Sequence, residues 1–176
     1  MSEAIVVLQE ASTKFPREGS IQVQLGGLFE RQKRYADAER IFRQVIADDP
    51  HQADALNSLG YMLAERGERL EESVDYVQRA LALDPGNAAY LDSLGWAYFK
   101  LNRLDLAERH LREASAQMET NSVVQGHLGE ILFKLGQYRE AIDAWQRALA
   151  GDGESITRAD IEGKIKAAKQ KLDKKK

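Results

Sequence analysis

The sequence contains no cysteine, which excludes disulfide bonds, thiolate metal sites and a cysteine nucleophile. It has only three prolines, and Pro50 and Pro85 each follow an apolar segment that they cannot continue as a helix. No run of 18 apolar residues is present, so we expect no direct membrane insertion. The net charge of −3 provides no overall basic field, which argues against a nucleic-acid partner.

A targeting segment is also lacking at the N-terminus. The first apolar run, Ala4 to Leu8, is too short for the core of a signal peptide, and no basic residue precedes it. We therefore expect a cytoplasmic location if the chain is complete, and a periplasmic or membrane-associated one if it is a fragment. The sequence leaves the compartment unknown, because proteins of either location commonly lack cysteine.

The sequence does contain an internal repeat. Four Leu-Gly pairs are spaced by 34, 35 and 34 residues. About a dozen residues after each pair comes alanine or serine, and four residues later a large side chain follows. A fixed period of this length is typical of solenoids, in which each unit buries its apolar face only by stacking on its neighbours. The glycines are Gly26, Gly60, Gly95 and Gly129, and the large residues are Phe42, Val77, Leu111 and Trp145.

Each unit contains two apolar segments of helical spacing that a polar turn separates. Gly67, Asn102 and Gly136 suit a left-handed turn after a helix, whereas the first unit has Lys33 there. Glycine at the crossing lets the two helices approach closely, so a leucine at Gly95 should overpack it and cost about 1–3 kcal/mol. We predict repeats at 19–52, 53–87, 88–121 and 122–155.

The two ends of the array are predicted to be single helices. Residues 1–18 match the second half of a repeat, and residues 156–176 form an apolar stripe with a lysine-rich tail. Thr157 and Asp160 have the spacing of a capping box. We interpret 156–176 as a capping helix with a solvated basic end, and prefer this to a nucleic-acid or anionic-membrane patch.

This pattern resembles the tetratricopeptide repeat (TPR) family. The resemblance covers residues 19–155, and the run from Leu91 to Trp96 resembles the C-terminal part of a bacterial TPR-containing protein. It implies an all-α fold: a right-handed α-solenoid of antiparallel helix pairs, a TPR superhelix with a C-terminal capping helix. It also implies adaptor or scaffold work through binding of a protein or peptide. The residues that carry it most fully are Leu91, Leu94, Gly95, Tyr98, Ala107, Leu111 and Ala114.

No arrangement of catalytic residues is evident, so we expect no enzymatic activity and no cofactor. His51, His110 and His127 stand in different repeats. His127 and Glu130 share a helix face, but two ligands do not make a tight metal site, and we predict none.

In the TPR family the first helices line a concave groove, where a peptide or partner helix binds. Tyr61, Trp96, Phe99 and Phe133 are not required by the packing pattern, so we expect them to be exposed there and to anchor the ligand. The alternative is that they pack between adjacent first helices and stiffen the array. The carboxylate clamp of chaperone-binding TPR proteins is not expected, because only Asn57 matches it. The predicted groove residues are Asn57, Tyr61, Glu65, Asp92, Trp96, Phe99, Lys100, His127, Glu130, Phe133 and Lys134.

A second function is self-assembly. The helix predicted within residues 1–18 lacks the first helix of its repeat, so an apolar edge around Ile5, Leu8 and the first helix of repeat 19–52 would be open. Such an edge could stack against another copy and form a homo-oligomer.

Overall fold

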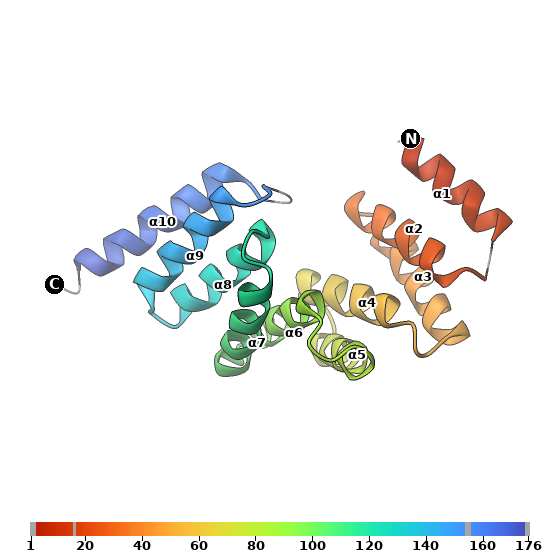
Figure 1. Cartoon of the computed structure of the whole chain (residues 1–176), viewed down its shortest axis with the longest axis horizontal. Helices are drawn as coiled ribbons and strands as arrows, with labels where there is room; N and C mark the ends of the chain where they lie inside the picture. The colour runs from red at the N-terminus through yellow and green to blue at the C-terminus, as the bar shows by residue number, and fades with distance from the viewer. Residues whose placement is uncertain (1–2, 16, 154–155, 175–176) are drawn as a thin grey trace. The chain divides into compact units, whose positions relative to one another are not determined.

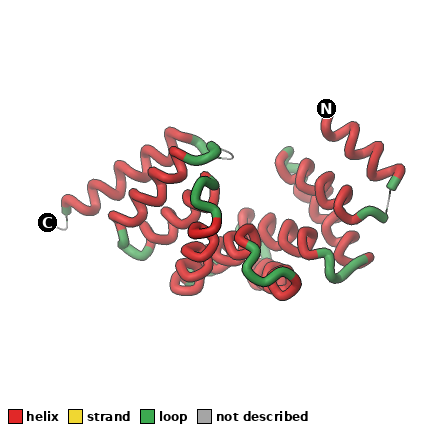
Figure 2. The backbone as a smooth tube through the Cα atoms, in the orientation of Figure 1, coloured by secondary structure: helices red, strands yellow, loops and turns green. Residues whose placement is uncertain are grey.

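The regular elements of the protein are α-helices, as a computed structural model shows (Figure 1). The structure describes residues 3–15, 17–153 and 156–174, with side chains from residue 6 onward. These ranges contain helices joined by short loops and no strand (Figure 2). The prediction of an all-α fold built from helix pairs is thus confirmed. The helices belong to two compact units, which divide between Pro85 and Gly86.

The first unit contains a single helix and two helix pairs. The single helix α1 packs against α2, which pairs with α3, and α3 packs in turn against the α4–α5 pair. The bounds are α1 Glu3–Lys14, α2 Gly19–Arg31, α3 Tyr35–Asp48, α4 Ala53–Arg66 and α5 Leu70–Leu83.

The second unit contains two helix pairs and a final single helix. The α6–α7 pair packs against the α8–α9 pair, and α10 lies against α9. Ile161, Ile165 and Ala168 of α10 are buried. The bounds are α6 Ala88–Lys100, α7 Leu104–Gln117, α8 Ser122–Lys134, α9 Tyr138–Ala150 and α10 Arg158–Asp173.

The start of α10 departs from the sequence prediction. Thr157 occupies the N-cap, but its side chain makes no capping hydrogen bond there. The carboxylate of Asp160 lies 2.6 Å from the ammonium of Lys164 instead. The predicted capping box is therefore wrong, because the ion pair within α10 engages the carboxylate that would have completed it. Among the described helices, none is long and apolar enough to cross a membrane.

The turn inside each helix pair has the same backbone form. Lys33, Gly67, Asn102 and Gly136 have φ of 61°, 68°, 58° and 77°, which is the left-handed region. Each donates its N–H to the carbonyl three residues earlier, and the next residue donates to the carbonyl five residues before itself. Glycine adopts this conformation freely, whereas a side chain such as that of Lys33 costs about 1 kcal/mol.

The crossing inside each pair depends on a missing side chain. A methyl group added at any of the four Leu-Gly glycines would overlap a large residue of the second helix. Those large residues are at most 1% exposed. The pairs in contact are Gly26 with Phe42, Gly60 with Val77, Gly95 with Leu111, and Gly129 with Trp145.

Candidate functional site

The predicted site residues of the second unit lie on two neighbouring first helices, α6 and α8. The repeat period places equivalent residues of these helices side by side. We call this surface the α6–α8 face. It consists of Asp92, Trp96, Phe99 and Lys100 of α6 with Gly126, His127, Glu130, Phe133 and Lys134 of α8.

An aromatic stack lies at the centre of the α6–α8 face. The ring of Trp96 stacks on His127, with 4.0 Å between the ring centroids and 15° between the planes. The Nδ1 atom of His127 lies 2.9 Å from Oδ1 of Asp92, which is itself buried. The contacting side chains form one layer that two repeats contribute to, because Asp92 and Trp96 come from α6 whereas His127 comes from α8.

Trp96 is covered more fully than the sequence predicts. Phe99 stacks on it at 5.0 Å, and the Lys100 ammonium lies 4.8 Å from its ring centroid. Trp96 is consequently only 8% exposed, so the expectation of a free aromatic anchor is wrong for this residue. Phe99 is half-buried and presents the remaining aromatic surface. Trp96 forms the floor of the face, because side chains of both helices cover its ring.

Phe133 also packs within the protein. Its ring centroid lies 5.3 Å from that of Tyr138 and 5.7 Å from that of Trp145, both in α9. Phe133 is half-buried as a result. These ring contacts are with the second helix of its own pair, which differs from both the exposed anchor and the packing between adjacent first helices that the sequence suggested.

On the α6–α8 face, Glu130 forms an ion pair with another helix, whereas Lys134 is exposed. The Glu130 carboxylate lies 2.5 Å from the Lys164 ammonium of α10. The acidic groups Asp92 and Glu130 are thus engaged by His127 and Lys164, and an exposed cation stands one turn beyond Glu130.

Gly126 leaves an open place on this face. The residue is buried, yet a methyl group added to it would meet no described atom within 4 Å outside its own helix surroundings. The equivalent position of the preceding repeat carries Asp92. Space for a side chain therefore exists beside His127 that the protein itself does not fill.

The predicted site residues of the first unit lie on α4. Asn57 and Tyr61 are half-buried, and Glu65 is exposed. The Oδ1 atom of Asn57 is buried and has no hydrogen-bond partner in the part of the chain that the structure describes. A buried amide oxygen without a partner is unfavourable.

Glu30 of α2 is a titratable group that the sequence analysis did not single out. Burial raises its pKa to about 7, Arg31 opposes this rise, and the negative charge of Glu65 adds to it. Glu30 occupies the repeat position that holds Phe99 and Phe133 in the later repeats. A comparison of equivalent positions could have found it as a carboxyl where the other repeats favour apolar side chains.

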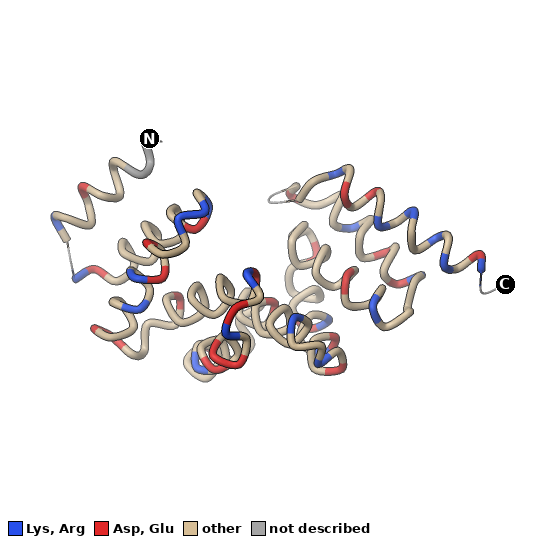
Figure 3. Tube along the Cα trace, turned by 180° about the vertical axis from the view of Figure 1, so that it is seen from behind, with Lys and Arg blue, Asp and Glu red and all other residues tan. Residues whose placement is uncertain are grey.

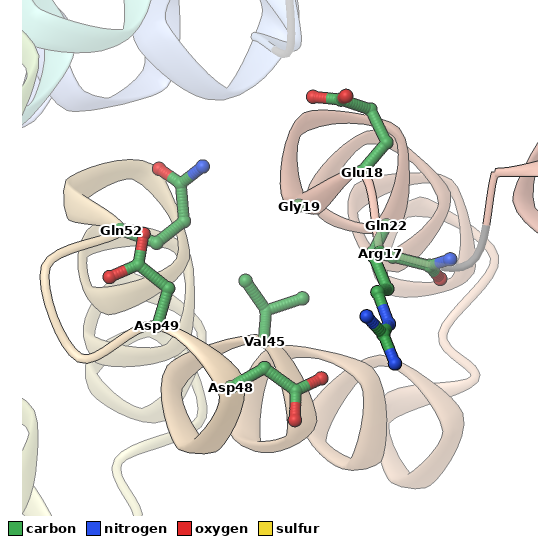
Figure 4. Close-up of a pocket in the computed structure, with 8 residues that line it drawn as sticks. All are labelled: Arg17, Glu18, Gly19, Gln22, Val45, Asp48, Asp49 and Gln52. Carbon is green, nitrogen blue, oxygen red and sulfur yellow. The ribbon is translucent and has the colours of Figure 1, made fainter.

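A pocket of about 620 Å³ opens in the first unit, and none of the predicted groove residues lines it (Figure 4). Val45 points into it from α3, Gly19 lies beside it on α2, and charged and amide side chains surround it. It lies where the start of α2 faces the end of α3. The lining residues are Arg17, Glu18, Gly19, Gln22, Val45, Asp48, Asp49 and Gln52.

Lysines are spaced along α10, the last helix of the second unit (Figure 3). Lys164 faces Glu130 and is half-buried, whereas Lys166, Lys169 and Lys171 are exposed. The helix therefore has an apolar side against α9 and a basic outer side.

No metal site is evident in the described ranges, where histidine and acidic residues form no cluster of three or more. His127 pairs with Asp92, and Glu130 pairs with Lys164. The two residues that the sequence considered together as metal ligands thus have separate partners.

The repeat pattern and the helix pairs correspond to a known family. The tetratricopeptide repeat family matches residues 23–88 and 66–122, and a second family model of the same description matches residues 124–150. The chain belongs to the TPR family. The TPR fold supports a general role in protein–protein interaction, as an adaptor or scaffold, and TPR proteins are generally non-catalytic interaction modules.

Similar TPR proteins occur in bacteria and in eukaryotes. The TPR repeat-containing protein PA4667 of Pseudomonas aeruginosa is 37% identical over 123 residues, which are 70% of this chain and 21% of that protein. Human tetratricopeptide repeat protein 7A is 29% identical over 129 residues, 73% of this chain and 15% of that protein. The chain thus spans about a fifth of PA4667 and less of the human protein.

Solved TPR structures share the fold. A thermophilic TPR protein of Thermus thermophilus, TTC0263, has a TM-score of 0.77 at 20% identity, with 94% of this chain and 88% of that chain covered. YrrB, a TPR protein described as having an unusual peptide-binding site, has a TM-score of 0.65 at 17% identity, with coverage of 94% and 84%. At these identities the likeness shows the TPR fold alone.

Proposed function

We propose that the α6–α8 face binds a segment of a partner protein, as a peptide or a helix, and that the chain acts as an adaptor or scaffold through it. The observation that carries this proposal is the open place at Gly126. It adjoins the layer formed by Asp92, Trp96 and His127, and no described side chain of the protein fills it. The peptide-binding site named for the TPR protein YrrB gives this proposal a precedent in the fold.

The chemistry of the face favours a mainly apolar ligand with a few acidic groups. Phe99 supplies aromatic surface, and an apolar side chain would fit the place beside Gly126. Asp92 and Glu130 are held by internal partners, whereas Lys134 is exposed and would pair with a carboxylate. A ligand with an apolar residue and an acidic residue would therefore match both features.

In the first unit, Asn57, Tyr61 and Glu65 form a separate proposed contact. The half-buried side chain of Asn57 would turn toward the ligand and hydrogen-bond to its backbone, because the described part of the protein supplies its Oδ1 atom with no donor. Asn57→Ala would then weaken ligand binding while removing a group that is unsatisfied in the free protein. The free energy of unfolding of the Asn57→Ala variant should equal or exceed that of the wild type.

Two glycines allow a matched test of the α6–α8 face. A leucine at Gly126 would fill the open place, whereas a leucine at Gly163 would point from the exposed surface of α10 into open space. Both variants should fold, since neither site is crowded. Proteins captured from a lysate are compared among the wild type, Gly126→Leu and Gly163→Leu, and the captured partner is then titrated by fluorescence anisotropy.

The proposal predicts that Gly126→Leu loses a partner that Gly163→Leu retains. Phe99→Ala and Lys134→Glu should each lower the affinity for the same partner by about tenfold. Equal capture by Gly126→Leu and the wild type would contradict the proposal and direct attention to other surfaces.

A further inference from the structure

The helix α1 occupies the place of the second helix in a repeat. The Ser12 hydroxyl donates a hydrogen bond of 3.0 Å to Oε1 of Gln22. The Ser115 hydroxyl donates the equivalent bond of 3.1 Å to Oε1 of Gln125, three repeat lengths further along the chain. This shared contact fixes the register, so α1 packs on α2 as α7 packs on α8.

The register identifies the surface of α1 that a first helix would cover. Val7 is 57% exposed, whereas its equivalents Ile41, Tyr76 and Ala144 are 8%, 9% and 0% exposed and the fourth, His110, is half-buried. Leu8 is half-buried, whereas the equivalent residues of all four complete repeats are at most 1% exposed and lie against a glycine. The Leu8 position is core in all four complete repeats and the Val7 position is buried in three of them, yet both are partly open in α1.

Val6 extends this apolar surface. It is 37% exposed, and its position holds a charged residue in each complete repeat: Arg40, Asp75, Arg109 and Asp143. An apolar side chain at a position that elsewhere faces solvent widens the open surface beyond what one repeat helix normally covers. We call the surface formed by Val6, Val7 and Leu8 the α1 face.

We propose that the α1 face binds one helix from outside residues 1–176, antiparallel to α1, with glycine or alanine opposite Leu8 and an apolar residue opposite Val7. The four complete repeats support this partner chemistry, because a Leu-Gly helix covers the equivalent face in each of them. Small residues at the crossing allow the backbone approach that buries a side chain of the size of Leu8. This surface lies in the first unit and is independent of the α6–α8 face.

A peptide with the sequence of residues 52–67 is a suitable probe, because it contains the Leu59-Gly60 pair in a helix of this type. Fluorescence anisotropy of the labelled peptide is measured against the full chain. Saturable binding is expected, and Val7→Glu in the protein should weaken it by about tenfold or more. Leu106→Glu is the matched control, since Leu106 is 39% exposed on α7 and should leave binding unchanged.

A second probe tests the crossing itself. The same peptide with Gly60→Leu should bind about tenfold more weakly, since its side chain would collide with Leu8. Absent binding, or binding that neither Val7→Glu nor the peptide's Gly60→Leu weakens, would overturn the proposal. Sedimentation is measured in parallel: a dimer that Val7→Glu dissociates would overturn it in favour of a second copy as the occupant.

Discussion

The first and fourth repeats pack their helix crossings in the same way. Gly26 lies against the ring of Phe42, and Gly129 lies against the ring of Trp145. Both rings are at most 1% exposed. An aromatic side chain can therefore fill the crossing in either repeat only because the opposing helix carries no Cβ, and this contact is the part of the repeat that the sequence pattern specifies.

The start of the first helix differs between these repeats. The Ser122 hydroxyl donates to the carbonyl of Ala148 at 2.7 Å and accepts from the N–H of Gly153 at 2.8 Å. These bonds connect the start of α8 to the end of α9 and to the loop that follows it. Gly19 occupies the same repeat position in the first repeat, and the 620 Å³ pocket opens beside it.

The two repeats also differ one turn beyond the crossing. Phe133 packs on Trp145 in the fourth repeat, whereas Glu30 occupies that position in the first. Burial there raises the pKa of Glu30 to about 7. The comparison shows that the family pattern fixes the contact inside a helix pair. Individual residues decide whether the start of the first helix is hydrogen-bonded, and whether the position one turn beyond the crossing is apolar or titratable.

The largest effect is expected from adding a methyl group to the shared crossing. Gly26→Ala and Gly129→Ala should each lower the free energy of unfolding by about 2–3 kcal/mol, because rigid buried rings must move. The higher helix propensity of alanine, about 1 kcal/mol, offsets part of the strain. Urea denaturation of both variants measures this. Tolerance in one repeat and loss in the other would show that the two crossings are not equivalent.

The next largest effect is expected at Ser122, whose hydroxyl makes the hydrogen bonds at the start of α8. Ser122→Ala removes a buried hydroxyl that bridges Ala148 and Gly153, and should lower the free energy of unfolding by about 2 kcal/mol. Ser122→Gly should cost somewhat more through its lower helix propensity. Ser20→Ala, at an exposed position of α2, is the control and should have little effect. A loss as large in the control would rule out the bridging explanation.

A smaller effect with a distinctive pH dependence is expected at Glu30. Its pKa is about 7 in the folded protein and about 4.5 as a free side chain, so the folded state binds more protons between these values. The free energy of unfolding contributed by Glu30 must then fall as the pH rises from about 4.5 to 7.

Glu30→Gln removes this penalty. It should stabilise the protein at pH 8 by about 1 kcal/mol and have little effect at pH 5. Thermal melts at the two pH values measure the difference. Glu71→Gln, at an exposed position of α5, serves as the control. A Glu30→Gln effect of the same size at both pH values would contradict a raised pKa.

Much of the fold could be predicted from the sequence because it depends on periodic residues. The Leu-Gly pairs and the large residues that oppose them recur at a fixed period, and each such pair makes the same contact in the structure. The left-handed turns at Gly67, Asn102 and Gly136 were predicted for a similar reason, since those residue types favour that conformation.

The α6–α8 face was predictable only in its location. The sequence placed Trp96 and His127 on neighbouring first helices, but whether a ring is exposed depends on the side chains of the next repeat. His127 was considered with Glu130 because they share a helix face, whereas its contact is with Asp92, 35 residues earlier. Contacts between repeats require a register across helices, which periodicity within one helix does not provide.

The smallest effect is expected from introducing a side chain at Gly19, at the start of the first helix of the first repeat. Gly19→Ser introduces the side chain that the fourth repeat has at this position, and its Cβ would lie 3.2 Å from Nε2 of Gln52. That amide ends a flexible, half-buried side chain and can move aside. Serine also restricts the unfolded chain more than glycine, so the variant should gain about 0.5 kcal/mol. Thermal melts of Gly19→Ser and Gly19→Ala separate the contribution of the hydroxyl from that of the Cβ. If both variants are destabilised, the end of α3 does not yield to a side chain at this position, and the pocket is a rigid feature of the first repeat.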